Sequence, residues 1–172
     1  MKKILLHTCC APCTTKVNLD LVENGFDVTG FFYNPNIYPL EEYEMRRKCM
    51  EYYSAISNLP MYYIENDLEH EAGNCVFCYE MRLYKAAQFA KSNGFDSFST
   101  TLLISPFQKH DVIKKIGLKT QEMLSIPFHY KDFRPHYYEG RALAQRYNLY
   151  RQKYCGCDVS LAQKEEKDEQ VA

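Results

Sequence analysis

Short apolar runs alternate with amphipathic helical patterns along most of this chain, and this alternation constrains the fold more than any other feature. The apolar runs are residues 2–8, 27–34, 60–66, 97–105 and 127–133. The helical patterns are residues 14–24, 41–57, 78–94, 108–124 and 138–149. Strands that alternate with helices form βαβ units, in which the strands run parallel. We therefore predict an α/β fold, a parallel-sheet Rossmann-like sandwich with about five strands.

A single domain accounts for the length of the chain. Its 172 residues are about one domain on the usual size relation, and the strand and helix patterns run without a linker through residues 1–160. Residues 161–172 are rich in acidic side chains and poor in apolar ones. We expect this last segment to be an unstructured tail, because it has little to bury.

The sequence favours a cytoplasmic protein that makes no contact with membranes. No apolar stretch is long enough to cross a bilayer, and the run at residues 4–6 is too short for a signal peptide. In the cytoplasm the eight cysteines should be reduced. Closely spaced thiols in that compartment indicate metal binding or catalysis rather than disulfides.

Six of the eight cysteines form three close pairs at the edges of predicted elements. The pairs are Cys9 with Cys10, Cys75 with Cys78, and Cys155 with Cys157. The first pair ends the first predicted strand, and sites in parallel sheets gather at the carboxyl ends of strands. Six thiols exceed the need of one tetrahedral zinc ion, and an iron–sulfur cluster takes about four. The spacing predicts that the pairs meet through the fold, and it leaves zinc and iron–sulfur both open.

The two remaining cysteines differ in their expected roles. Cys13 lies near the expected start of the first helix, where the pKa of a thiol falls and the thiolate is favoured. Cys49 lies in the middle of a predicted helix beside Met50. We expect Cys49 to be a packed thiol without a chemical role.

The turn after the first strand lacks the usual signatures of nucleotide binding. It has no G-x-G-x-x-G motif, and cysteines stand where adenylating enzymes of similar layout carry a pyrophosphate-binding loop, which argues against the use of ATP. After the fourth predicted strand, Ser105 and Lys109 are candidates for substrate contact and His110 for proton donation. Ser105 as the cap of the next helix and His110 as a surface residue are the alternatives.

Charge is distributed unevenly along the chain. Basic residues exceed acidic ones by six over residues 109–153, whereas acidic residues are in excess by four over residues 1–108 and by three over residues 154–172. The basic segment also contains many Tyr and Phe residues. Cationic side chains bind phosphate and aromatic rings stack on unpaired bases, so we expect this segment to contact single-stranded or loop RNA through Arg134, Arg146 and Arg151. Aromatic core packing explains part of the same pattern.

Four stretches together resemble the QueH-type epoxyqueuosine reductases. The stretches are "LLHTCCAPC", "CVFCYEMRL", "TTLLISPFQKHD" and "DFRPHYYEGRALAQRYNLYRQKYCGC", and the resemblance covers residues 3 to about 160. It implies a fold of the adenine-nucleotide α-hydrolase-like (HUP) type, a 4Fe–4S cluster with a second mononuclear metal beside it, expected to be iron, and reduction of epoxyqueuosine at the tRNA wobble position to queuosine. The implied metal ligands are Cys9, Cys10, Cys75, Cys78, Cys155 and Cys157, with Cys13 where some members have a carboxylate.

The resemblance also frames a mechanism. Conversion of an epoxide to an alkene needs two electrons and the loss of the oxygen as water. The cluster would supply the electrons one at a time, and an external donor of the ferredoxin or flavodoxin type would reduce it again. Asp158, His110 and Tyr154 are candidates for the acid that protonates the leaving oxygen. Arg82, one helical turn after Cys78, is a candidate to hold substrate or to screen thiolate charge.

Two other functions compete with this interpretation. One is another iron–sulfur enzyme that modifies tRNA, for example by thiolation, which normally needs ATP. The other is a zinc-stabilised RNA-binding module without catalysis, because the paired thiols suit zinc as well.

Overall fold

A computed structural model describes residues 1–65 and 74–171, and its centre is a parallel sheet of four strands. The strands are β1 (Lys2–His7), β2 (Phe26–Phe32), β3 (Met61–Tyr63) and β4 (Ser97–Thr100). They lie in the order β3-β2-β1-β4 and every neighbouring pair is parallel. The strand order reverses beside β1, and such reversal points are where ligands bind in open α/β sheets.

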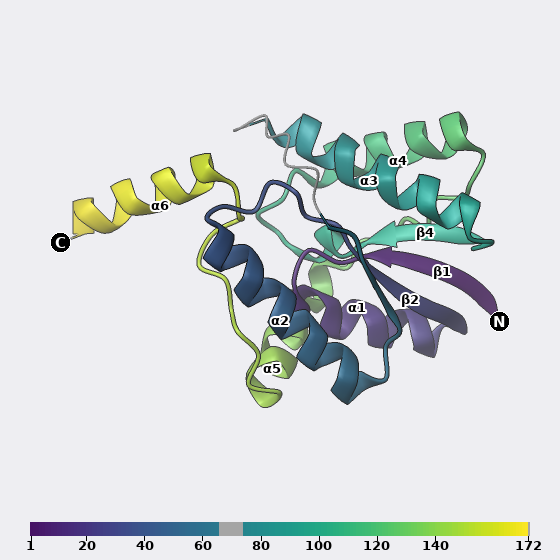
Figure 1. Ribbon diagram of the computed structural model, residues 1–172, viewed down its shortest axis with the longest axis horizontal. Coiled ribbons are helices and arrows are strands. Elements are labelled where there is room, and N and C mark those ends of the chain that lie inside the picture. The colour runs from purple at the N-terminus through teal and green to yellow at the C-terminus, as the bar shows by residue number, and fades with distance from the viewer. Residues whose placement is uncertain (66–73, 172) are drawn as a thin grey trace.

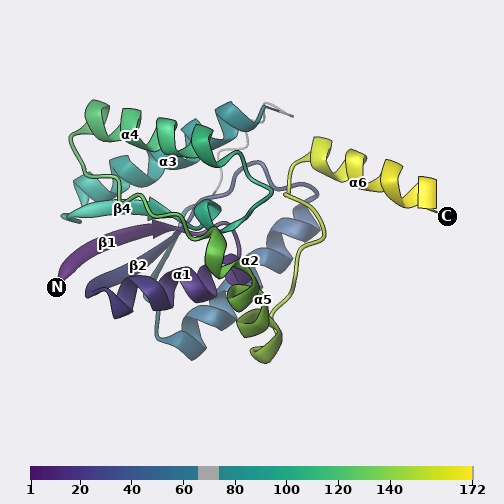
Figure 2. The same ribbon diagram turned by 180° about the vertical axis from the view of Figure 1, so that it is seen from behind.

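The described residues form helices that cover both faces of the sheet and a last helix that lies apart from them. They are α1 (Ala11–Glu23), α2 (Leu40–Ser57), α3 (Cys75–Ser92), α4 (His110–Leu124), α5 (Tyr137–Arg146) and α6 (Asp158–Val171), with the short 3₁₀ helices η1 (Thr101–Ile104) and η2 (Arg134–His136). Helices α1, α2 and α5 lie on one face, and α3 and α4 on the other (Figures 1 and 2). The predicted α/β fold with a parallel sheet is confirmed.

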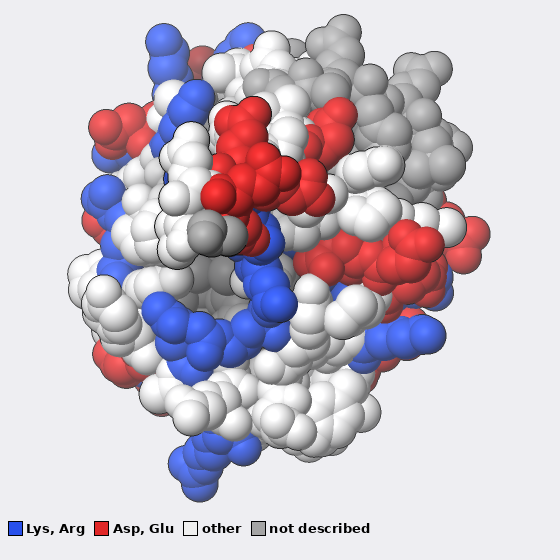
Figure 3. Space-filling view, turned by 90° about the vertical axis from the view of Figure 1, so that its left-hand side faces the viewer, with Lys and Arg blue, Asp and Glu red and all other residues white. Residues whose placement is uncertain are grey.

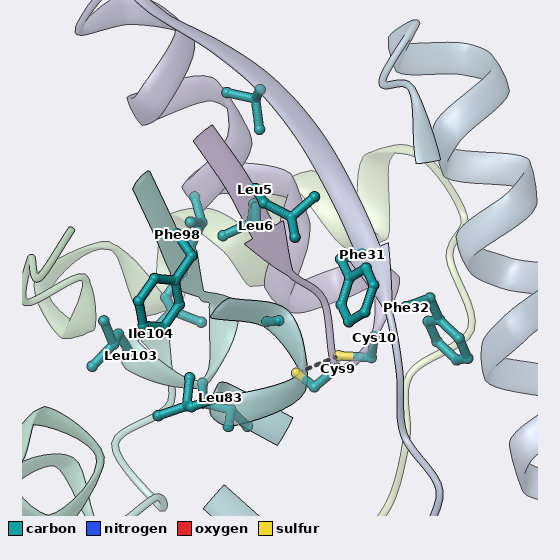
Figure 4. Packing of buried hydrophobic residues seen from close by; sticks show 14 of the residues in the cluster. Leu5, Leu6, Cys9, Cys10, Phe31, Phe32, Leu83, Phe98, Leu103 and Ile104 are labelled. Carbon is teal, nitrogen blue, oxygen red and sulfur yellow. Dashed lines mark hydrogen bonds between the residues drawn. The ribbon is translucent and has the colours of Figure 1, made fainter. Parts of the chain in front are cut away.

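The hydrophobic core lies between the sheet and these two helical layers. Leu5 and Leu6 on β1 point to opposite faces, as successive strand residues must, and both are fully buried, as are Phe31 on β2 and Phe98 on β4. Figure 4 shows Leu5 and Leu6 along β1, with Phe31 near Cys9 and Cys10 and Phe98 on the other side of the strand. The last turn before the first cysteine pair is therefore anchored in the core.

The segment expected to form a fifth strand makes only one bridge with the sheet. Phe98 and Phe128 pair in parallel, with hydrogen bonds from Phe98 N to Pro127 O and from His129 N to Phe98 O. The fourth strand is also shorter than predicted, because the Thr100 hydroxyl accepts a hydrogen bond from Leu102 N and begins η1. With so short a neighbour, the Phe128 segment has little edge to pair with.

The acidic end of the chain is a helix in the structure rather than an unstructured tail. Helix α6 begins at Asp158, and none of its described residues is buried. It projects away from the two helical layers (Figure 1). An ion pair between Lys164 and Asp168, one turn apart, supports it. Within residues 1–65 and 74–171, no helix combines the length and the apolar character needed to cross a membrane.

Candidate metal centre

Three thiols meet in the turn that joins β1 to α1. Cys10 is the extended N-cap residue of α1, with φ of −165° and ψ of 160°, and Pro12 lies in the first turn, where its missing N–H costs nothing. The sulfurs of Cys9, Cys10 and Cys13 all lie within 4.8 Å of one another. We call these three residues the thiol trio. The Sγ atoms of Cys9 and Cys10 are 3.8 Å apart, and Figure 4 shows them facing each other at the end of β1.

The three thiols of the trio shift one another's pKa values. Hydrogen bonds from the Cys10 and Cys13 thiols, and from Thr101 Oγ1 at 3.2 Å, hold the pKa of Cys9 well below its ordinary value despite burial. A hydrogen bond with Cys13 lowers the pKa of Cys10, but its hydrogen bond with Cys9 and its burial together raise it. The pKa of Cys13 is raised by its hydrogen bonds with Cys10 and Cys9, which is opposite to the lowering expected for a thiol at the start of a helix. A metal ion would replace the thiol protons, since thiolates rather than thiols are metal ligands.

The second pair lies in the first turn of α3. The side chain of Asn74 accepts hydrogen bonds from Val76 N and Phe77 N, which fixes the start of the helix at Cys75. Cys75 is exposed and Cys78 is half-buried. The first turn of one helix thus carries both members of this pair.

The third pair lies on the loop before α6, and a buried arginine of α2 holds that loop. Arg46 is 2% exposed, and its guanidinium donates to the carbonyl oxygens of Cys155 at 2.8 Å and Tyr154 at 3.0 Å. Its Nε donates to Glu42 at 2.7 Å, and Tyr150 donates to the other Glu42 oxygen at 2.6 Å. We call Arg46 and Glu42, with these loop contacts, the Arg46 clamp.

Gly156 fits the Arg46 clamp because it has no side chain. A Cβ at this position would lie 2.9 Å from Arg46 Nη1, and the backbone φ of 135° disfavours any other residue. Its carbonyl accepts a hydrogen bond from Tyr38 N at 2.7 Å. The "C-G-C" spacing therefore reflects close approach of the loop backbone to a buried cation.

Electrostatic neighbours connect the three pairs at the carboxyl edge of the sheet. Burial opposes the charge on Arg46, yet Cys10, Glu42 and Cys9 together raise its pKa. Burial also raises the pKa of Cys155, and the charges of Cys78 and Cys157 add to this effect. Arg46 thus lies near Cys9 and Cys10 while it binds the loop that carries Cys155.

A small cavity opens beside the thiol trio. Its volume is about 90 Å³, and its walls are Pro12, Cys13, Ile104, Tyr137, Gly140, Arg141, Arg151 and Gln152. Figure 3 looks at this edge of the molecule and shows Lys and Arg side chains around a hollow, with acidic side chains beside it. Arg151, a predicted substrate contact, is at the cavity wall.

The other predicted arginines have different surroundings. Arg82 is 5% exposed and donates to Asn34 Oδ1 at 2.7 Å and Asn36 Oδ1 at 2.6 Å, so its guanidinium is engaged with the loop after β2. Arg134 is exposed and forms an ion pair with Asp132. Arg146 is exposed in the last turn of α5.

The predicted residues after β4 contact the neighbouring segments. Ser105 follows η1 rather than capping the next α-helix, and its hydroxyl accepts from Phe107 N. Lys109 is exposed, and its backbone N–H donates to the Tyr79 hydroxyl. His110 is buried at the start of α4, where Nε2 lies 2.9 Å from the Tyr130 hydroxyl, and burial followed by the charge of Arg134 lowers its pKa.

The remaining acid candidates flank the third thiol pair. The Tyr154 hydroxyl donates to Tyr38 O, and its ring lies 5.5 Å from the Arg46 guanidinium carbon. Asp158 is exposed directly after Cys157, and its carboxylate accepts from Val159 N at 2.8 Å. Cys49 is packed against the core, as expected, with its sulfur 3.9 Å from Tyr150 O.

The donor set fits a thiolate-ligated metal centre. The trio supplies three clustered sulfurs, and the buried guanidinium group of Arg46 binds the loop that carries Cys155. Soft thiolate sulfur is the ligand type of iron–sulfur clusters and of zinc. Cys13 provides the trio with a third sulfur ligand. An acidic residue at this position would provide an oxygen ligand instead.

Comparison with known proteins identifies the family. A family model described as "Epoxyqueuosine reductase QueH" matches residues 4–163. The chain belongs to this QueH family. Curated proteins named epoxyqueuosine reductase QueH are 38% identical in Dehalococcoides mccartyi, over 92% of each chain, and 36% identical in Thermotoga maritima, over 100% of this chain and 97% of the relative. A third, from Acinetobacter baylyi, is 34% identical over 92% of this chain and 80% of its own. The predicted family and enzyme class, an oxidoreductase, are confirmed.

Several QueH residues beside the thiols escaped the sequence analysis. They are Asn36 on the loop after β2, Glu42 and Arg46 on α2, Gln108 before α4, and Gln152 on the loop before the third pair. Only Asn36 had a usable signal, since the turn-rich "NPNIYP" follows the second strand at its carboxyl end. The others contact cysteines or their loop from distant parts of the chain, which spacing does not reveal.

Proposed function

We propose that this QueH chain reduces epoxyqueuosine in tRNA to queuosine, using a 4Fe–4S cluster and a second metal ion, expected to be iron, held by its clustered thiols. The clustering of Cys9, Cys10 and Cys13 at the carboxyl end of β1 carries this proposal. The bond of Arg46 to the Cys155 carbonyl and the contact of Gln152 with Cys10 support it. The paired cysteines Cys9, Cys10, Cys75, Cys78, Cys155 and Cys157 and the additional Cys13 are the proposed ligands. Residues 1–160 act as one catalytic domain in the cytoplasm.

The reaction sets out what the chain must provide. Opening the epoxide to an alkene consumes two electrons and two protons and releases one water molecule. When bound, the metal centre supplies electrons one at a time and polarises oxygen. An external low-potential donor of the ferredoxin or flavodoxin type returns those electrons.

The cavity beside Cys13 is the proposed entrance for the modified nucleotide. Tyr137, Arg141 and Arg151 line it together with Cys13, so an aromatic side chain and two cations border the approach to the thiol trio. Arginine binds the phosphates beside the nucleotide, and the tyrosine ring stacks on an unpaired base. Lys109, Ser105, Arg134 and Arg146 extend the contact to the rest of the tRNA.

Proton delivery is assigned to the loop of the third thiol pair. Asp158 follows Cys157 directly and its carboxylate is exposed, so it can pass a proton from water to the leaving oxygen. The hydroxyl of Tyr154, which directly precedes Cys155 on the same loop, is the second proton donor. His110 faces Tyr130 and serves as a more remote proton source.

Nucleoside analysis tests the function directly. Anaerobically reconstituted protein is incubated with tRNA that contains epoxyqueuosine and a low-potential reductant, and the tRNA is then digested and separated. We expect queuosine to appear, and Cys10→Ala, Cys78→Ala and Cys157→Ala each to abolish its formation. Cys49→Ala is the control and should retain activity. Equal loss in Cys49→Ala would contradict the assignment of the ligands.

A zinc-stabilised RNA-binding module is the competing function, because a site of three clustered thiols also suits zinc. Colourless protein with stoichiometric zinc and no acid-labile sulfide, which binds tRNA without converting it, would favour that function over the reductase.

A further inference from the structure

Each cysteine pair has one sulfur that accepts a hydrogen bond from a side-chain amide. Gln152 Nε2 lies 2.9 Å from Cys10 Sγ, and Asn36 Nδ2 lies 3.3 Å from Cys78 Sγ. Gln108 Nε2 lies 3.4 Å from Cys155 Sγ. The three amides come from three separate loops, so their common use of sulfur as acceptor is not a consequence of local sequence.

Two of these amides are oriented by residues of α3. The Tyr79 hydroxyl donates to Gln108 Oε1 at 2.7 Å, and Arg82 donates to Asn36 Oδ1 at 2.6 Å. With each oxygen occupied by a donor, the NH₂ group of each amide must face the sulfur. Tyr79 and Arg82 follow Cys75 and Cys78 by four residues, so the helix that presents the second pair also aims the amides one turn later.

We propose that Asn36, Gln108 and Gln152 set the reduction potential of the metal centre by donating N–H···S hydrogen bonds to its thiolate ligands. This inference rests on the proposed function, because it requires thiolates bound to a redox-active centre. Reduction adds negative charge to the centre, and a donor directed at a ligand sulfur stabilises the more negative state. The donors therefore raise the potential. Carboxamides do so without taking up or releasing protons themselves.

The test measures the potential of the reconstituted protein rather than its activity. Gln152→Met, Gln108→Met and Asn36→Leu each remove the donor and keep similar bulk, and iron and sulfide are assayed in every sample. At a fixed electrode potential we expect each variant to lower the reduced-to-oxidised ratio by about three- to tenfold. A tenfold change is about 59 mV for a one-electron couple.

Two further variants separate tuning from structural damage. Tyr79→Phe leaves Gln108 in place and removes only the hydroxyl that orients it, so it should shift the ratio in the same direction by a smaller factor. Gln88→Met is the matched control, because Gln88 is an exposed carboxamide on α3 and should leave the ratio at the wild-type value.

Cobalt(II) added to the metal-free protein gives a second readout for any variant that assembles no cluster. An N–H donor stabilises the sulfur lone pair and raises the energy of sulfur-to-cobalt charge transfer. Loss of the donor in Gln152→Met should therefore move that absorption band to longer wavelength.

The possible outcomes distinguish failure of this inference from failure of the proposed reductase function. Clusters at full iron and sulfide content whose ratios match Gln88→Met, together with an unmoved cobalt band, would overturn the role of the amides and leave the reductase intact. Wild-type protein that holds no redox-active iron would overturn both.

Discussion

The thiol trio and the other four paired cysteines reach the same edge of the sheet by different means. Cys9, Cys10 and Cys13 lie on one turn, and among the described residues they form the only group of three or more candidate ligands within 4.8 Å. The remaining four, which we call the distal thiols, are Cys75, Cys78, Cys155 and Cys157, and they are exposed or half-buried. The trio is preorganised by its own backbone, whereas the distal thiols depend on contacts between segments far apart in the chain.

The contacts that hold the distal thiols are specific. The Arg46 clamp holds the Cys155 loop by its carbonyl oxygens, and Arg82 connects α3 to the loop after β2. Both guanidinium groups are buried. Damage to either should therefore affect the distal thiols and leave the trio in place, and the predictions below test that difference.

The largest effect is expected from Arg46→Leu. It leaves the Glu42 carboxylate buried without its cation and frees the Cys155 loop, at a cost of about 3–5 kcal/mol in the free energy of unfolding. Denaturant unfolding measures the loss, and thiol alkylation followed by peptide mapping should show faster labelling of Cys155 and Cys157 than in wild type. Arg47→Leu is the control, since Arg47 makes a partly exposed ion pair with Glu51 worth about 0–1 kcal/mol. Equal losses in the two variants would contradict the clamp.

Substitution of Cys13 tests the thiol trio rather than the distal thiols. Cys13→Ala leaves the trio with two sulfurs, and we expect zinc affinity of the metal-free protein, measured by competition with a coloured chelator, to fall on the order of tenfold or more. Cys13→Asp restores a ligand of oxygen type and should recover part of that loss. If both variants bind zinc as the wild type does, Cys13 is not a ligand and the trio is a pair.

Gly156→Ala should have an intermediate effect. The added Cβ meets the Arg46 guanidinium at 2.9 Å at a backbone φ of 135°, which costs about 1–3 kcal/mol. The contact part of this cost should be smaller in the Arg46→Leu background, and a double-mutant cycle measures the coupling. Gly25→Ala gives the cost of positive φ alone, because Gly25 has φ of 83° and nothing near its missing Cβ. Strict additivity would show that Gly156 and Arg46 act independently.

The smallest effect concerns His110, which lies outside both thiol groups. Burial, and then the charge of Arg134, lowers its pKa below 6.5, although Asp132 and Asp111 oppose the shift. The unfolded chain therefore takes up a proton at a higher pH than the folded one. The stability that His110 contributes is full above pH 6.5 and is lost as the pH falls from there towards the lowered pKa.

Unfolding midpoints measured against pH would reveal this slope. His110→Gln should flatten it, and metal content should remain at the wild-type value because His110 contacts Tyr130 rather than a thiol. A steeper decline in His110→Gln would reverse the sign of the argument.

Much of the fold could be predicted from the sequence, because periodicity reports local structure. The run at Ile4–Leu6 marks β1, and Gly25 marks the end of α1. The limits of β4 could not be predicted, since they depend on the Thr100 side chain turning back to bond Leu102 N. Helix α6 was missed because it has no buried face to create a pattern.

In the site, too, local sequence predicted some features, whereas others depend on contacts between distant segments. The pair Cys9 and Cys10 could be predicted because its members are adjacent in sequence and follow the first strand. Cys13 was left outside the pairs, and the closeness of its sulfur to theirs appears only in the folded chain. Arg46 carried no sequence signal, because its importance lies in carbonyl groups more than a hundred positions later. Arg82 was noticed for its spacing from Cys78, but its buried contacts with Asn34 and Asn36 appear only in the folded chain.

The apolar interior between the sheet and its helices is built from side chains that shield one another. Leu5, Phe31 and Phe98 belong to this core, and Cys9 and Cys10 are buried in the same cluster. The packing of the chain itself therefore holds Cys9 and Cys10 in position at the end of β1.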